Sequence, residues 1–181
     1  MKVGVVYDTC DNYADAGNDM CVEIFDKYFK KYNAKFIYPD NRWSVWDMAV
    51  VIGDVTYYVE NKIKFNGSLF KDLFILKSKY EEIREFMEGK DPNKVRFIYM
   101  NYFPMIGKAV MYNLTYPKTY RETIDHNTNS TANLCDIKPY ESDREMLLLP
   151  LGEDSKTFVD VNSNVEVFYA NKIWKNGRIV V

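Results

Sequence analysis

Residues 46–62 have the sequence WDMAVVIGDVTYYVENK, and this segment constrains the architecture more than any other. It contains two runs rich in β-branched and aromatic residues, 46–52 and 55–62, joined by Gly53-Asp54. A two-residue link that begins with glycine is typical of a tight β-hairpin turn. The segment therefore predicts an antiparallel hairpin in which Asp47 lies opposite Glu60.

The two faces of this hairpin differ in chemistry, because side chains alternate between the faces of a strand. Asp47, Glu60 and Lys62 share one face, which we expect to be the solvent-exposed side of the sheet. The opposite face is wholly apolar and should build the core. Its members are Met48, Val50, Ile52, Val55, Tyr57 and Val59.

The opposed acids need a counter-charge. Directly opposed Cβ atoms lie about 5 Å apart, and two carboxylates at that distance repel by roughly 3 kcal/mol at an effective dielectric near 20. A divalent ion such as Mg²⁺ suits such a pair together with water and a phosphate, and Lys62 could then orient the attacking water. The alternative is an exposed strand end where Lys62 only screens Glu60.

Working outward, the hydrophobic pattern predicts further elements in both directions. On the N-terminal side we expect a strand, an acidic connector, an amphipathic helix and a short strand, over residues 2–7, 8–17, 18–31 and 34–38. After the hairpin, 69–76 is a strand or a buried loop, and a capping box of Ser78 and Glu81 predicts a helix over 79–89. A second hairpin follows, with strands at 95–103 and 108–114.

The last third is harder to place. Residues 115–144 are rich in Asn, Thr, Ser and Asp, which predicts a long loop. Four short β segments follow, at 145–151, 157–161, 165–170 and 178–181. The chain thus begins as α/β and ends mostly as β.

Asp47, twelve intervening residues and then Glu60-Asn61-Lys62 resemble the Asp…Glu-x-Lys signature of the PD-(D/E)XK nuclease superfamily. The core order of that superfamily is helix, three-stranded meander, helix and strand, which matches the predicted order. The resemblance implies an α/β fold with a mixed, restriction-endonuclease-like central sheet flanked by helices. The resemblance covers roughly residues 17–103 and leaves the last third unexplained. Together with the predicted elements, it leads us to expect a nuclease-like core, 1–114, and a loop and β-rich extension packed on the same domain, 115–181.

The resemblance also implies roles for the hairpin residues. Asp47 and Glu60 would bind Mg²⁺ or Mn²⁺ together with the backbone carbonyl of Asn61, and Lys62 would be the catalytic lysine. The literal Pro39-Asp40 precedes the hairpin, which leaves Asp40 as a second candidate for the first ligand. The cross-strand pairing favours Asp47.

Two further catalytic residues follow from the resemblance. Many members place a glutamate on the first helix, and Glu23 is similar, eleven residues before Ala34. A surface ion pair of Glu23 with Lys27 is the alternative. Members often carry a Lys at the start of the next helix, and Lys79 has this position here. The alternative is a solvated lysine. A cation is unfavourable at a helix N-terminus unless an anionic partner lies nearby.

A local excess of lysines follows the signature. Lys62, Lys64, Lys71, Lys77 and Lys79 face Asp72 alone, and we expect Lys64, Lys71, Lys77 and Lys79 to bind nucleic acid, with a solvated face as the alternative. The whole chain has 24 Lys and Arg against 26 Asp and Glu. Contact with DNA must therefore be local, which favours a homodimer or a structured substrate.

Several classes are disfavoured. Three cysteines without a Cys-x-x-Cys pair and a single histidine, His126, argue against a zinc site and suit a reducing cytoplasm. No run approaches the ~20 apolar residues of a membrane span, and no signal peptide is expected at the start. The glycine-rich loops of nucleotide cofactor sites are missing.

These observations lead to one functional hypothesis and its competitors. The hypothesis is a metal-dependent DNA endonuclease, resolvase-like or nicking, encoded by a phage and acting in the cytoplasm of its host. The competitors are an inactive nuclease-fold module for binding or anti-defence, and a phage structural protein. Trp43 and Trp46, just before the hairpin, are expected to be core anchors rather than base-stacking platforms.

Overall fold

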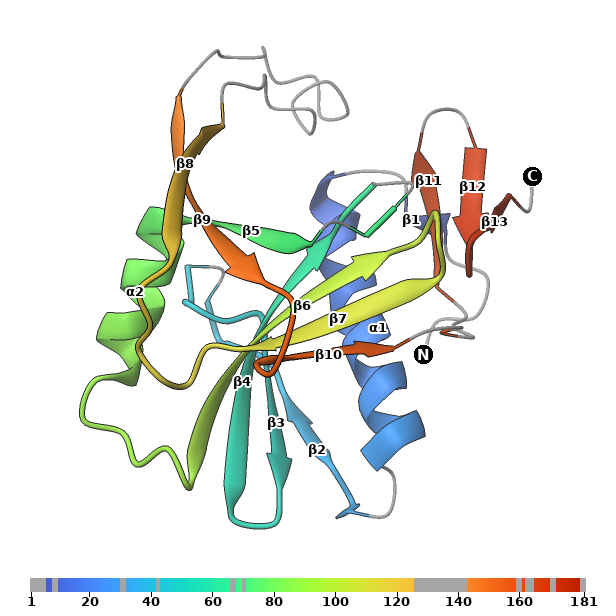
Figure 1. Ribbon diagram of the computed structural model, residues 1–181. Helices are drawn as coiled ribbons and strands as arrows, with labels where there is room; N and C mark the ends of the chain where they lie inside the picture. Colours follow the sequence, from blue (N-terminus) through green and yellow to red (C-terminus); the bar gives the residue numbers. More distant parts are fainter. Residues whose placement is uncertain are drawn as a thin grey trace.

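The computed structural model describes residues 6–7, 10–29, 32–41, 43–65, 68–69, 71–125, 143–158, 161, 165–169 and 172–179. His126 and Cys135 lie outside these residues. The elements, labelled in Figure 1, are β1 (Val6–Tyr7), α1 (Cys10–Phe29), β2 (Lys35–Ile37), β3 (Met48–Ile52), β4 (Val55–Ile63), β5 (Asp72–Leu76), α2 (Lys77–Met87), β6 (Val95–Phe103), β7 (Lys108–Asn113), β8 (Arg121–Asp125), β9 (Arg144–Pro150), β10 (Ser155–Phe158), β11 (Glu166–Tyr169), β12 (Lys172–Lys175) and β13 (Arg178–Ile179).

A six-stranded sheet forms the centre of the fold, in the order β10-β7-β6-β4-β3-β2. Strands β2, β3 and β4 form an antiparallel meander, and β4 pairs with β6 in parallel. A parallel pair needs a crossover, and α2 lies in the connection between β4 and β6. The mixed sheet and the order helix, meander, helix, strand are thus confirmed.

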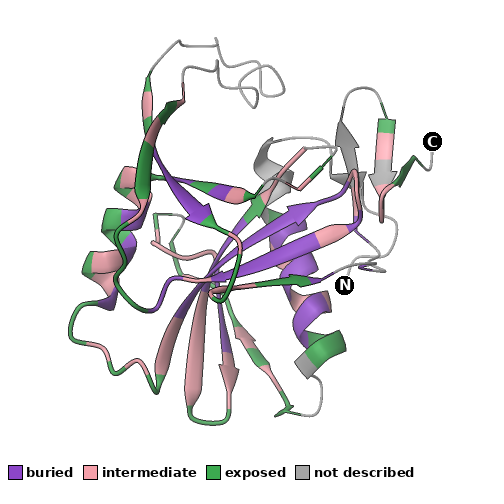
Figure 2. Cartoon of the chain, viewed as in Figure 1, coloured by how far each residue is buried: buried purple, intermediate pink, exposed green. Residues whose placement is uncertain are grey.

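The two helices cover opposite faces of this sheet, and both faces are buried where the strands cross the middle of the molecule (Figure 2). Each large side chain buried there contributes about 1.5–3 kcal/mol. The α1 face is filled by Met20, Cys21, Ile24, Phe25, Met48, Val50 and Val59, and the α2 face by Tyr80, Ile83, Met87, Phe97, Tyr99 and Tyr112. Neither described helix is long and apolar enough to cross a membrane.

Helix α1 begins at Cys10, so the prediction of an acidic connector over 8–17 is wrong for most of its length. Acidic residues are favourable near a helix N-terminus, where they complement the helix dipole. Ala16 is completely buried, which fixes this early part of the helix against the sheet. The apolar periodicity alone could not reveal this extension, because its first turns are polar.

Gly17 marks the closest approach of α1 to β4. A Cβ added at Gly17 would lie 2.9 Å from the Cβ of Asn61. We expect Gly17→Ala to destabilise the protein by about 1 kcal/mol, because an overpacking cost of roughly 1–3 kcal/mol exceeds the ~1 kcal/mol gained in helix propensity. Urea denaturation measures this difference. Gly152→Ala, where no atom lies within 4 Å of the added Cβ, is the control; equal stability of Gly17→Ala and the wild type would contradict the prediction.

The segment predicted as a loop over 115–144 contains β8, so this prediction is wrong for Arg121–Asp125. β8 pairs with β9, and β9 pairs in turn with β5, which gives a three-stranded sheet. Polar composition hid β8, because its exposed side chains lack an apolar alternation. Strand β12 was also missed, and it pairs with β11 and β13.

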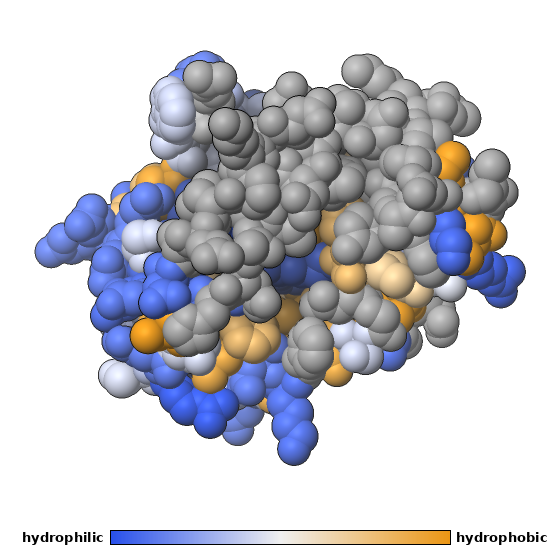
Figure 3. Space-filling view, turned by 90° about the horizontal axis from the view of Figure 1, so that it is seen from above, coloured by the Kyte–Doolittle hydropathy of each residue, from blue (hydrophilic) through white to orange (hydrophobic). Residues whose placement is uncertain are grey.

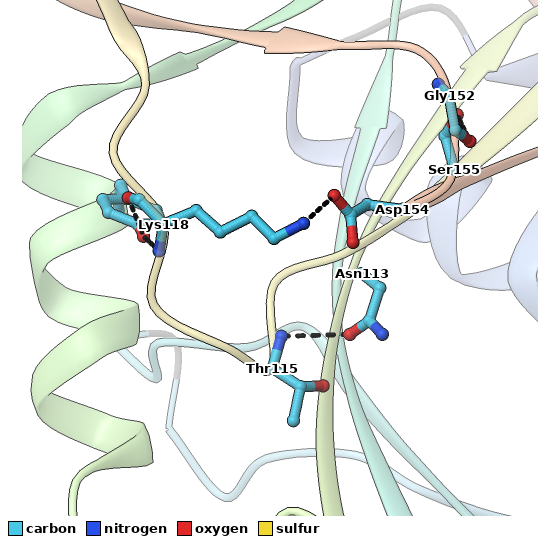
Figure 4. A network of polar contacts seen from close by, with 7 residues as sticks. Asn113, Thr115, Lys118, Gly152, Asp154 and Ser155 are labelled. Atoms are coloured by element: carbon cyan, nitrogen blue, oxygen red, sulfur yellow. Dashed lines mark hydrogen bonds and ion pairs between the residues drawn. The ribbon is translucent and has the colours of Figure 1, made fainter.

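The C-terminal strands complete sheets begun earlier in the chain. β10 adds to the β7 edge of the central sheet, and β11 pairs in parallel with β1. A polar network fastens the β9–β10 turn to the segment after β7 (Figure 4). In it Lys118 pairs with Asp154, the backbone N–H of Asn113 donates to the Asp154 carbonyl at 2.7 Å, and the Asn113 side chain accepts from the Thr115 N–H at 3.0 Å.

Candidate active site

The hairpin has the predicted register. Met48 pairs with Val59 and Ile52 with Val55, and Gly53 takes a positive φ of 62° in the turn. Asp47 directly precedes β3, and its N–H donates to the Val59 carbonyl at 2.9 Å. The Oδ2 atom of Asp47 accepts a hydrogen bond from the Asn61 N–H at 2.7 Å. Asp47 is therefore fixed beside β4. Its carboxylate accepts the Asn61 N–H, as a backbone carbonyl of a neighbouring strand would do in a regular sheet.

Glu60 is the centre of an ion-pair cluster. Its side chain is only 3% exposed. Lys62 Nζ lies 2.6 Å from Glu60 Oε1, and Lys79 Nζ lies 3.5 Å from Glu60 Oε2. The lysine side chains are 45% and 21% exposed, respectively. The carboxylate is thus enclosed, while Lys62 connects the cluster to solvent.

The expectation that this face of the hairpin is the solvent-exposed side of the sheet is wrong. Tyr58, on the same face as Glu60, packs edge-on against Phe86 of α2 with ring centroids 4.8 Å apart. Trp46 packs on Tyr58 from the other side, at 5.1 Å. An exposed strand end in which Lys62 merely screens Glu60 is excluded as well, because Glu60 is buried.

Burial and neighbouring charges change the proton affinity of the cluster. Burial raises the pKa of Glu60 above its ordinary value, with Lys62 and Lys79 opposing and Asp47 adding to the increase. Burial lowers the pKa of Lys62, but the carboxylates of Glu60 and Asp47 outweigh it and raise that pKa overall. The hydrogen bond from the Asn61 N–H holds Asp47 beside Glu60 and Lys62, and its charge therefore acts on the pKa of both groups.

Lys79 belongs to this cluster. The prediction that its helix begins at residue 79, after a cap at Ser78, is wrong. Helix α2 begins at Lys77, directly after β5, and its N-cap is Leu76 without a side-chain hydrogen bond. Ser78 is therefore inside the helix and forms no capping box. Lys79 lies in the first turn, where its anionic partners are Glu60 and Glu82, both at 3.5 Å.

Glu23 is not brought into a three-carboxylate group. Among the residues that the structure describes, no three His, Cys, Asp or Glu side chains come together as a metal cluster. The carboxylate of Glu23 instead contributes to raising the pKa of the Tyr102 phenol, which burial raises most. Asn18, five residues earlier on α1, makes the polar contact to β4: its Oδ1 accepts a hydrogen bond from Asn61 Nδ2 at 2.8 Å.

The lysines that were predicted to bind nucleic acid, Lys64, Lys71, Lys77 and Lys79, have different environments. Lys77 forms ion pairs with Glu122 at 3.2 Å and Glu145 at 3.4 Å, which offset its charge. Lys71 is exposed. Lys64 is half-buried directly after β4, and burial, followed by the charge of Lys62, lowers its pKa. Lys62 and Lys79 both pair with Glu60, so the prediction that these lysines form one strip for nucleic acid stays a prediction.

The two tryptophans before β3 have different environments. Trp46 packs against the α2-side core, as predicted. Trp43 is 81% exposed, so the prediction that it anchors the core is wrong. It follows a turn in which Asn41 Oδ1 accepts the Trp43 N–H at 2.9 Å, and this turn presents the side chain outward.

Asn18 and Asn101 are polar residues of this region that the sequence did not reveal. Asn18 is the first residue of the helix predicted from the apolar periodicity, but nothing in that pattern marks it as a polar contact to β4. Asn101 lies on β6 at the register position of Lys62. Nothing in the local sequence distinguishes either asparagine, because both become site residues only through long-range pairing.

Comparisons with known proteins give one solved structure. No protein-family model matches the chain, and no curated protein does. The chain is similar to Hjc, a Holliday junction resolvase from the archaeal hyperthermophile Archaeoglobus fulgidus, with 11% sequence identity and a TM-score of 0.40. The similarity covers 76% of this chain and 93% of the resolvase chain.

Proposed function

We propose that this chain is a metal-dependent DNA endonuclease of the PD-(D/E)XK type, which hydrolyses phosphodiester bonds in a nicking or resolvase-like manner. The observation that carries the proposal is the enclosed Glu60 carboxylate, held by Lys62 and Lys79 and electrostatically coupled to Asp47. Burying such a charge cluster costs several kcal/mol per ion before pairing. A buried charge cluster that reaches solvent at Lys62 lowers the stability of the fold, so a catalytic role explains it better than a structural one.

The donor set fits Mg²⁺ or Mn²⁺. These ions prefer oxygen ligands and are commonly held by one or two carboxylates, with waters and substrate phosphate completing the coordination. Asp47, Glu60 and the carbonyl of Asn61 supply oxygens of this kind from adjacent strands.

A bound ion of this class would lower the pKa of the attacking water and stabilise the charge on the departing oxygen. The residues of the chain then have separate tasks. Asp47 is held in place by the Asn61 N–H, so its remaining oxygen has a fixed position. Lys62, released from Glu60, orients the attacking water from the exposed end of β4, and Lys79 stabilises the phosphate. Glu23 stays a predicted site residue without a role in these steps.

The charge distribution restricts how DNA approaches. The outer face of α2 exposes Glu81, Glu82, Glu85 and Glu88, and hydrophilic side chains gather on that side of the molecule in Figure 3. This face repels a phosphate backbone. We therefore infer that DNA contacts the C-terminal end of β4, where Lys62 lies and which Lys64 directly follows.

The decisive test is cleavage of nucleic acid by the purified protein. We expect supercoiled plasmid or a four-way junction to be cut with Mg²⁺ or Mn²⁺ and left intact with EDTA. Saturating metal at 100 times its Kd should also stabilise the fold by about 2.7 kcal/mol. If every DNA and RNA form stays intact with both metals, the inactive binding module becomes the better hypothesis. The homodimer, the phage origin and the cytoplasmic location stay predictions.

A further inference from the structure

Asn101 is a buried amide in the interior of the central sheet. Its side chain is 0% exposed, and its Oδ1 atom has no hydrogen-bond partner among the residues that the structure describes. Buried polar groups are almost always paired, because an unpaired one forfeits its hydrogen bonds to water. An asparagine in this position therefore lowers the stability of the fold, and its presence needs a reason other than packing.

The register places Asn101 beside the candidate site. β4 and β6 are parallel, and Asn101 is the partner of Lys62 in their ladder, just as Tyr99 is the partner of Glu60. Side chains at paired positions of adjacent strands lie on the same face of a sheet. Asn101 is thus on the Glu60 and Lys62 face, next to the more exposed end of the cluster.

The electrostatics of Tyr99 support this placement. Burial raises the pKa of Tyr99 most, and the charges of Glu60 and Asp47 raise it further, while a hydrogen bond from the Asn101 side chain lowers it. The phenol of Tyr99 donates its own hydrogen to the Phe74 carbonyl at 3.0 Å. Asn101 therefore acts on the phenol as a donor, through Nδ2, and its Oδ1 atom is left for another group on this face.

We propose that Asn101 is a positioning residue for Lys62, a role that rests on the proposed nuclease function. When Glu60 is engaged by a metal ion, the Lys62 ammonium loses the carboxylate oxygen that now lies 2.6 Å from it. Oδ1 of Asn101 then accepts a hydrogen bond from Lys62 Nζ and holds the amine where it orients water. Oδ1 of Asn101 is unpaired without metal because Lys62 is still bound to Glu60.

A neutral acceptor suits this task better than a charged or an apolar side chain. An aspartate would form a second ion pair and keep Lys62 away from the substrate. A leucine would leave the released ammonium without a partner in a region of low dielectric, which is unfavourable. An asparagine offers an oxygen without competing with the phosphate for the lysine charge.

The test combines stability, metal binding and kinetics of the full-length protein. For Asn101→Leu we expect the melting temperature of the metal-free protein to stay the same or rise by about 2–4 °C. We expect its Mg²⁺ affinity, measured by calorimetry, to fall at least threefold, and its kcat to fall at least tenfold with KM within twofold. Asn113→Leu is the matched control and should lower the melting temperature, because Asn113 accepts a hydrogen bond from the Thr115 N–H.

A second pair of variants separates the lost oxygen from altered packing. Thr and Val have the same shape, so Asn101→Thr should retain more of kcat than Asn101→Val. A melting temperature of Asn101→Leu below that of the wild type, or a kcat equal to it, would overturn the positioning role alone. An inactive wild-type protein would instead overturn the proposed nuclease function, and the role of Asn101 with it.

Discussion

Replacing Lys62 by methionine is expected to abolish cleavage and to tighten metal binding in the same protein. Cleavage should fall by about 10²–10⁴-fold, the usual contribution of a positioned proton-transfer or water-orienting group. Metal affinity should rise, because the ammonium that lies 2.6 Å from Glu60 no longer competes for its oxygen. If Lys62 and Glu60 formed only a structural ion pair, there would be no reason for cleavage to fall while metal affinity rises.

The same variant makes stability depend on metal. Without Lys62, Glu60 is left enclosed near Asp47 with Lys79 as its nearest described cation, at 3.5 Å. Breaking a buried pair costs about 3–5 kcal/mol, and we expect a loss near the lower end because Lys79 remains. Chemical denaturation with EDTA and with saturating Mg²⁺ measures the loss and its recovery. Lys71→Met, at an exposed lysine, is the control; a metal-independent loss of stability would contradict the prediction.

The second large effect is expected for Glu60→Gln. The amide keeps the shape of the side chain but removes the charge that attracts a divalent ion, so metal-induced stabilisation and cleavage should both disappear. The metal-free fold should lose less than in Lys62→Met, because Lys62 is 45% exposed and can turn to water. Calorimetry with Mg²⁺ and plasmid nicking measure these results, and Glu81→Gln on the exposed side of α2 is the control.

The pH dependence of stability distinguishes Glu60 from a surface acid. Burial raises the pKa of Glu60 above its ordinary value of 4.5, so the folded state binds a proton at a pH where the unfolded state does not. Lowering the pH through the raised pKa towards 4.5 should therefore stabilise the wild type relative to Glu60→Gln. A stability difference that stays constant with pH would place Glu60 in a solvated environment, contrary to the structure.

The hairpin shows what local sequence can predict. A two-residue turn with glycine first fixes the pairing of the adjacent strands, so the positions of Asp47 and Glu60 followed from Gly53-Asp54 alone. Which elements cover each face is a different question. The packing of Phe86 on Tyr58 depends on α2 folding back over the sheet, and no pattern within the hairpin contains that information.

The rest of the site depends on pairing between distant segments. Lys79 was predicted from family resemblance, whereas its ion pair with Glu60 depends on how α2 lies against β4. Asn101 reaches the site only because β4 and β6 are parallel, and the register of a parallel pair is not set by a short turn. The polar strand β8 was missed for the same reason, since its pairing partner β9 supplies the apolar side chains.

The pairing of β1 with β11 and of β7 with β10 has a consequence for how the protein is made. A ribosome delivers the first partner of each pair long before the second, so nascent chains display open strand edges while synthesis continues. High contact order of this kind slows folding and exposes intermediates to aggregation. Efficient production of this nuclease candidate therefore depends on chaperones or slow expression until the final strands have emerged.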